Sequence, residues 1–136
     1  MQKQQHLLEE CKHNLGDFHP QVADVLTSIG LFHHHITGSQ EHALRSYRLA
    51  MEVYQHNRDE RREYQDGYKS EYTTDVKMGI TLTDIGNAYE SMENYVEATE
   101  NYEKALEIYR YHGMEEDHPR VLATSRCLYR SNRFVI

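Results

Sequence analysis

Arginine side chains gather near the C-terminal end of this 136-residue chain. No carboxylate side chain follows Asp117, whereas four arginines do: Arg120, Arg126, Arg130 and Arg133. The last three are spaced i, i+4 and i+7, so a helix would place their guanidinium groups on one face. A planar guanidinium can bind a carboxylate through two parallel hydrogen bonds, so this face could bind an acidic peptide. The alternative is a solvated face, or one that pairs with acidic residues of a helix outside this chain.

Histidine is frequent, with ten residues in the chain, of which His33, His34 and His35 are consecutive. Successive residues of a helix point about 100° apart, so three adjacent imidazoles cannot all ligate one metal ion in helical geometry. His35 and His42 form a conceivable pair, but no Asp or Cys completes a recognisable zinc set around them. We therefore expect no metal site.

The remaining reactive side chains give no enzymatic motif. Cys11 and Cys127 lack CxxC spacing, and we expect both to be reduced and structural. The chain has no GxSxG, GxxxxGK[ST] or GxGxxG sequence, and Glu90, Glu93 and Glu97 fit a solvated helical face. We expect a protein with no catalytic residues and no cofactor.

The formal net charge of −7 argues against a nucleic-acid partner, because binding to phosphate needs a basic face. No apolar segment approaches the roughly twenty residues that span a bilayer. The N-terminal residues do not open a signal peptide either. These features predict a soluble, cytoplasmic protein with neither a nucleic-acid nor a membrane partner.

Helices are the elements that must position these side chains. Leu82, Ile85 and Tyr89 fall on one stripe of a helix, and Gly86 lies on the same stripe, where its missing side chain lets a neighbouring helix approach. A second stripe alternates small and large residues: Ala98, Tyr102, Ala105, Leu106 and Tyr109. The connection at residues 91–95 is short enough to force the two helices antiparallel.

The same pattern occurs earlier in the chain, at Leu26, Ile29, Gly30, Ala43, Tyr47, Ala50 and Tyr54. This copy has one extra residue in its turn, which we place in the loop-like run 35–39. His19-Pro20 introduces this first hairpin, and His118-Pro119 introduces another apolar run. Because proline fits the first turn of a helix, the second His-Pro pair predicts the first helix of a third repeat.

Residues 15–23 read LGDFHPQVA, and ALEIY at 105–109 leads to EDHP at 116–119. With the helical pairs, these phrases resemble the longer tetratricopeptide repeats of the kinesin-light-chain type, from about Leu7 onward. The resemblance implies an all-α solenoid of helix-turn-helix hairpins that binds partners. We expect about six antiparallel helices, at residues 3–15, 20–35, 40–64, 74–91, 95–112 and 118–131.

These helices are expected to form one domain over residues 1–136. Its parts are an orphan helix at 1–18, repeats at 19–57 and 75–113, a partial repeat at 114–136, and an insert at 58–74. The insert departs from the spacing of the family, and we expect it to extend the preceding helix to about Tyr64. Its tyrosines, Tyr64, Tyr68 and Tyr72, are expected to fold back on the array, with docking of a partner as the alternative.

The resemblance implies that the first helix of each hairpin lines a concave groove. By that alignment the groove receives Thr27, Leu31, His34, Thr83, Asn87, Glu90, Arg126 and Arg130. Three of these, Asn87, Arg126 and Arg130, match positions that hold the terminal carboxylate in repeats that clamp peptide C-termini. Thr27 and Leu31 stand where such clamps have Lys and Asn.

The sequence thus favours a non-catalytic protein-protein interaction module that binds a peptide or protein partner in the groove, with an acidic segment as one candidate. The alternative is a structural self-associating element, a homodimer or a longer stack. In that case the incomplete terminal repeats and the apolar tail 134–136 would bury each other.

Overall fold

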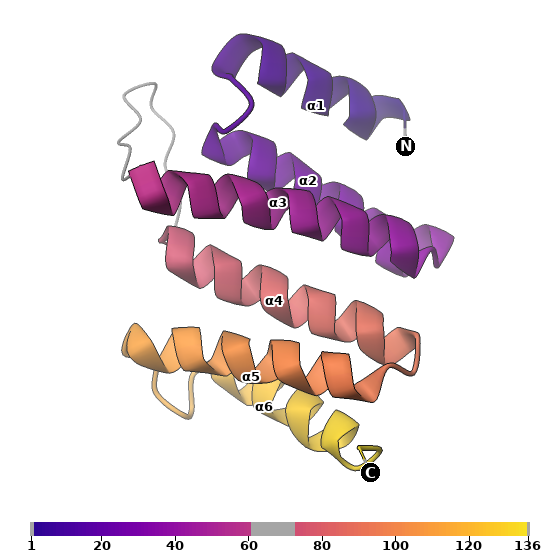
Figure 1. Ribbon diagram of the computed structural model, residues 1–136, viewed down its shortest axis with the longest axis vertical. Helices are drawn as coiled ribbons and strands as arrows, with labels where there is room; N and C mark the ends of the chain where they lie inside the picture. The colour runs from indigo at the N-terminus through magenta and orange to yellow at the C-terminus, as the bar shows by residue number, and fades with distance from the viewer. Residues whose placement is uncertain (1, 61–72, 136) are drawn as a thin grey trace. The chain divides into compact units, whose positions relative to one another are not determined.

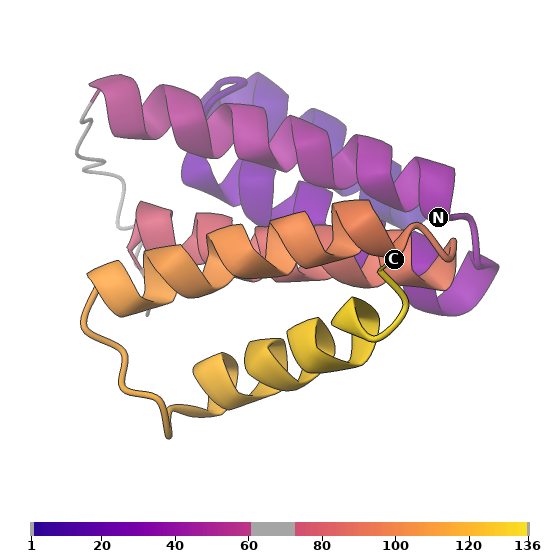
Figure 2. The same ribbon diagram turned by 60° about the horizontal axis from the view of Figure 1, so that its bottom comes forward.

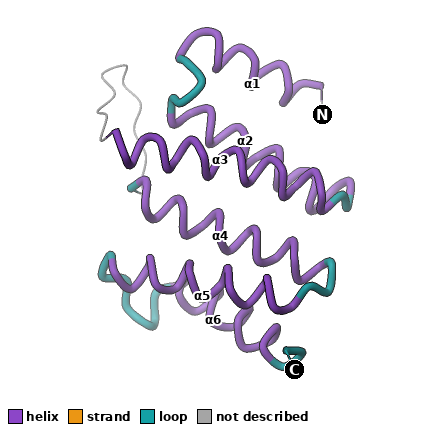
Figure 3. The backbone as a smooth tube through the Cα atoms, in the orientation of Figure 1, coloured by secondary structure: helices purple, strands orange, loops and turns teal. Residues whose placement is uncertain are grey.

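The computed structural model describes residues 2–60 and 73–135. In these residues the backbone forms six α-helices and one π-helical turn, joined by short loops, with no strand (Figures 1 and 3). The expected all-α helical-repeat fold is therefore confirmed. The chain divides into two compact units, Met1–Lys77 and Met78–Ile136.

The first unit contains α1 (Gln2–Leu15), α2 (Pro20–Phe32), the π-helical turn η1 (His33–Thr37) and α3 (Gln40–Glu60). In Figure 1, α2 lies beside α1 and beside α3, and it packs against both. The apolar residues of α2 form the centre of this unit, since Val22, Ala23 and Ile29 are almost fully buried.

The second unit contains most of α4 (Thr74–Ser91), which begins at the end of the first unit, then α5 (Tyr95–Tyr111) and α6 (Pro119–Asn132). Figure 2 shows α6 turning back along α5, against which it packs. Every one of these helices agrees with the expected bounds to within one residue.

Tyrosine rings lying on glycines set the closest helix contacts. The ring of Tyr102 in α5 covers Gly86 in α4 so closely that a Cβ atom at Gly86 would lie 2.5 Å from Tyr102 Cε1. The ring of Tyr47 in α3 covers Gly30 in α2 in the same way. Both tyrosines are completely buried. The predicted role of the two glycines is confirmed, and each hairpin is held by the same small-against-large contact.

A further contact of this type places Tyr109 over Gly79, at 2.8 Å from a Cβ built on the glycine. Tyr109 is fully buried, as its spacing predicts. Tyr89 was expected in the core with it, but its side chain is half-buried, because it lies in the last turn of α4 next to the loop.

The turn between α4 and α5 closes the second hairpin. The Asn94 N–H donates to the Tyr89 carbonyl at 2.9 Å, and the Glu93 N–H donates to the Glu90 carbonyl at 3.0 Å. This pair of bonds is the Schellman motif, which needs a residue at positive φ. Glu93 fills that position with φ 61°, whereas Gly113 fills it at the end of α5 with φ 78°.

The π-helical turn corrects one expectation. A helix over 20–35 was predicted, followed by a loop with one inserted residue, but α2 ends at Phe32 and the chain stays helical through Thr37. A π-helical turn holds more residues per turn than an α-helix, so it takes up the inserted residue and leaves only Gly38 and Ser39 between it and α3. Gly38, with φ 71°, then ends the turn.

Other expectations stay predictions. The extension of α3 to Tyr64 and the expected fold-back of Tyr64, Tyr68 and Tyr72 lie outside the described residues, since α3 is described to Glu60. The division of the chain into an orphan helix, repeats and an insert likewise stays a prediction.

Candidate partner-binding surface

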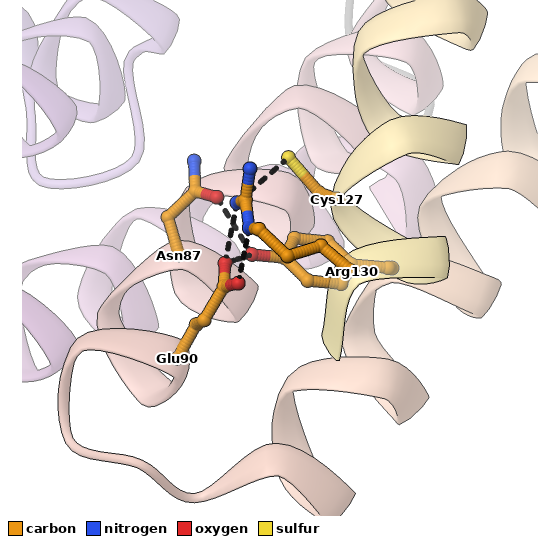
Figure 4. A network of polar contacts seen from close by, with 5 residues as sticks. Asn87, Glu90, Cys127 and Arg130 are labelled. Carbon is orange, nitrogen blue, oxygen red and sulfur yellow. Dashed lines mark hydrogen bonds and ion pairs between the residues drawn. The ribbon is translucent and has the colours of Figure 1, made fainter. Parts of the chain in front are cut away.

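A polar network joins α4, α5 and α6 within the second unit (Figure 4). The Tyr102 hydroxyl lies 2.7 Å from Asn87 Oδ1 and 2.9 Å from Glu90 Oε2, and its single hydrogen is shared between these acceptors. Arg130 completes the network by donating to both Glu90 oxygens, from Nε at 2.5 Å and from Nη2 at 2.7 Å. A residue of α6 is thereby fixed to the last turn of α4.

The network sets the charge states of its members. The hydrogen bonds from Arg130 are the main reason that the pKa of Glu90 lies below its ordinary value. Burial, with the hydrogen bond to Glu90, raises the pKa of Tyr102, so the hydroxyl stays protonated and remains a donor. The Glu90 carboxylate raises the pKa of Arg130 in turn.

Arg130 was predicted to bind a partner's carboxylate, but the structure gives it one from its own chain. The Glu90 side chain is 16% exposed and that of Arg130 is 55% exposed, so the pair lies at the edge of the packed interior. The predicted alternatives were a solvated face or pairing with a helix outside this chain, whereas the carboxylate that Arg130 binds lies on α4.

Arg126 is placed differently. It lies one helical turn before Arg130 and is exposed, and within the described ranges it makes no ion pair or hydrogen bond. Asn87 uses its oxygen for Tyr102, and Figure 4 shows its amide nitrogen turned away from the network. Arg126 thus offers an uncompensated guanidinium on the described surface of α6, and Asn87 offers an unused amide donor on α4.

Thr83 is half-buried and takes part in packing within the second unit. Its Oγ1 donates to the Gly79 carbonyl at 3.1 Å and lies 3.2 Å from Thr124 Oγ1 and 3.3 Å from the Tyr109 hydroxyl. Thr124 is almost fully buried. The sequence analysis did not predict that Thr124 and Tyr102 form hydrogen bonds with residues of α4. The predicted stripe of α5 faces α4, which carries Asn87 and Glu90, so the hydroxyl of Tyr102 could have been assigned to them.

Thr27 and His34 lie in the first unit. Thr27 Oγ1 donates to the Asp24 carbonyl at 2.9 Å, and His34 Nδ1 lies 2.6 Å from Gln40 Oε1. Leu31, predicted to line the groove with them, is 38% exposed. Their joining with the residues of α4 and α6 in one groove stays a prediction.

The first unit also has a small open cavity between α1, α2 and α3. Its volume of about 160 Å³ suits one aliphatic side chain rather than a cofactor or a drug-sized ligand. It is lined by Lys12, Asp17, Phe18, Val22, Leu26, Leu49, Glu52 and Val53.

The part of the chain that the structure describes contains no cluster of side chains arranged for metal binding or thiol chemistry. No three His, Cys, Asp or Glu side chains are grouped there so as to hold a metal ion. The rings of His33 and His42 stack with their centroids 5.1 Å apart. Cys11 and Cys127 are free thiols.

Residues 80–112 match the tetratricopeptide repeat family. The matched segment runs through α4 and α5 and contains the Gly86–Tyr102 contact. The match supports a tetratricopeptide repeat protein, and repeats of this family generally mediate protein-protein interaction and are not catalytic. No curated protein matches the chain. None of the described helices combines the length and the apolar character needed to cross a bilayer.

Proposed function

We propose that the chain is a non-catalytic protein-binding module that holds an extended acidic peptide along α4 and α6, in the concave groove of a tetratricopeptide array. The observation that carries this proposal is the contrast between two arginines on one face of α6. Glu90 neutralises Arg130, whereas Arg126, one turn away, is exposed and uncompensated.

The network gives this surface a fixed polar partner for a peptide backbone. Because the Tyr102 hydroxyl donates to Asn87 Oδ1, the Asn87 amide group is oriented before any ligand arrives. The unused N–H groups of Asn87 can then donate to a peptide carbonyl without first reorganising. Arg126 supplies the planar donors for a peptide carboxylate.

The net charge requires this recognition to be local. A chain with a formal charge of −7 repels acidic ligands at long range, and salt screens that repulsion beyond about 10 Å. Binding through one exposed guanidinium is therefore expected to be weak and to depend on the position of the carboxylate in the peptide. The interpretation as kinesin-light-chain-like repeats and the cytoplasmic location belong to the same proposal, and the free thiols are consistent with a reducing compartment.

An array of unstructured peptides graded in Asp and Glu content tests the proposal. The wild-type chain is expected to retain acidic peptides, and Arg126→Gln is expected to lose them. Arg45→Gln removes an exposed arginine from α3 and serves as the matched control. Equal retention of acidic peptides and of their Gln and Asn counterparts would contradict the proposed chemistry.

A further inference from the structure

Helices α2 and α6 begin in the same way, so their residues can be matched one by one. Each follows a histidine N-cap in extended conformation and starts with proline. His19 Nδ1 accepts from the Gln21 N–H at 3.0 Å, and His118 Nδ1 accepts from the Arg120 N–H at 3.1 Å. The match also aligns buried Val22 with buried Val121.

This match identifies a face that is covered on α2 and open on α6. On α2 the face consists of Ala23, Leu26 and Gly30, all buried in the first unit. The matching residues Leu122, Ser125 and Tyr129, here called the outer face of α6, lie open or partly open on the second unit. Leu122 is 40% exposed and Tyr129 is 76% exposed.

Tyr129 shows that this face does not receive a second helix in the way that α2 receives α3. The contact of α2 with α3 depends on Gly30, since even a Cβ atom there would overlap the ring of Tyr47. Tyr129 occupies the matching position on α6. The outer face of α6 therefore presents a projecting ring where a repeat hairpin needs a depression.

Opposite charges flank this face at its two ends. Arg133 follows Tyr129 by one helical turn and is exposed. At the other end, Glu115 and Asp117 precede α6; both are exposed and have no ion-pair partner among the residues described. Glu116 between them is occupied by Arg110, whose Nε lies 2.8 Å from Glu116 Oε1.

We propose that a second copy of this chain covers the outer face of α6, with the two α6 helices antiparallel across a two-fold axis near Ser125. In that arrangement Tyr129 of each copy packs on Leu122 of the other, and the small Ser125 lies at the crossing. Arg133 of each copy then reaches Asp117 of the other. In such an isologous interface the same patch of each copy contacts the other. Each charged end then meets an opposite charge, and the two apolar centres pack together.

The interface is small. One helix face on each side buries less than the roughly 1,200 Å² of total surface typical of stable complexes, so a weak, concentration-dependent dimer is expected. Arg126 lies one helical turn after Leu122 and three residues before Tyr129, so it borders this face, and a peptide bound at Arg126 is expected to compete with the dimer.

Sedimentation velocity of the full chain over a wide concentration range tests the proposal. The wild-type chain is expected to move from monomer toward dimer as concentration rises, and Tyr129→Glu is expected to weaken dimerisation by at least about tenfold, since it places a charge in the apolar contact. Tyr111→Glu alters an equally exposed tyrosine at the end of α5 and is expected to leave the dimer unchanged.

A charge exchange tests the antiparallel arrangement. Arg133→Glu and Asp117→Lys are each expected to weaken the dimer, and the double variant is expected to restore it, because the reversed charges meet across the two-fold axis. Circular dichroism establishes that each variant stays helical. A wild-type chain that remains monomeric throughout, or a dimer that Tyr129→Glu leaves intact, would overturn the proposal, as would a double variant no better than the single ones.

Discussion

Arg130 and Glu90, forty positions apart in the chain, form a two-pronged ion pair that ties α6 to the last turn of α4. The carboxylate also accepts from the buried Tyr102 hydroxyl, so three helices of the second unit meet at one group. This pair decides which arginine of α6 remains available to a partner.

Arg130→Gln is expected to destabilise the protein. The substitution removes both charged hydrogen bonds and leaves a Glu90 carboxylate that is mostly shielded from water, at a cost of about 1–2 kcal/mol. Chemical unfolding followed by circular dichroism measures this loss. Arg126→Gln, one turn away and without a partner, is the matched control and is expected to change the unfolding free energy by less than about 0.5 kcal/mol. Equal effects of the two substitutions would contradict the placement of Arg130.

Acidification is expected to lower the stability of the folded protein, because it protonates Glu90 in its pair with Arg130. The pKa of Glu90 is held below its ordinary value of 4.5, so the folded state binds this proton less readily than the unfolded state does. The stabilisation is complete above about pH 4.5 and is lost as pH falls below that value through the folded-state pKa.

The melting temperature measured as a function of pH, for the wild-type chain and for Glu90→Gln, isolates this contribution. The two curves are expected to converge below pH 4.5 and to separate above it, with the wild-type chain the more stable. Parallel curves across the whole range would show that Glu90 does not titrate with folding.

Much of the helical arrangement within each unit could be predicted from the sequence because local rules determine it. The spacing of Gly86 and Tyr102 predicted the packing stripe, and the two His-Pro pairs predicted where α2 and α6 begin. The pairing of Arg130 with Glu90 could not be predicted in the same way, since the charges of a helix face do not reveal which carboxylate another helix brings to it. The π-helical turn was missed because an insertion can be absorbed within a helix as well as in a loop.

Glu93→Gly is expected to stabilise the protein. Glu93 occupies a left-handed conformation that costs a side-chain-bearing residue about 1 kcal/mol relative to glycine, and part of this gain is offset by the greater freedom of glycine in the unfolded chain. Thermal unfolding should show a higher melting temperature. Gly113→Ala, at the equivalent position of α5, is expected to lower it. A lower melting temperature for Glu93→Gly would contradict the account of this turn.

Gly86→Ala is expected to destabilise the second unit. A methyl group there would overlap the Tyr102 ring, and such overpacking costs about 1–3 kcal/mol, more than the gain of about 1 kcal/mol from the better helix propensity of alanine. In the background Tyr102→Leu, which removes the ring, Gly86→Ala is expected to cost less. Urea unfolding of the four proteins of this double-mutant cycle gives the coupling, and strict additivity would show that the ring and the glycine do not contact.

The most direct test of the proposed function is the affinity of an acidic peptide selected from the array, measured by fluorescence anisotropy for the wild-type chain and for Arg126→Gln. The account predicts that Arg126→Gln weakens binding by about tenfold, as expected for the loss of one charged hydrogen-bonding group. It also predicts that Arg45→Gln binds as the wild-type chain does. Unchanged affinity of Arg126→Gln, with a folded protein, would contradict the account.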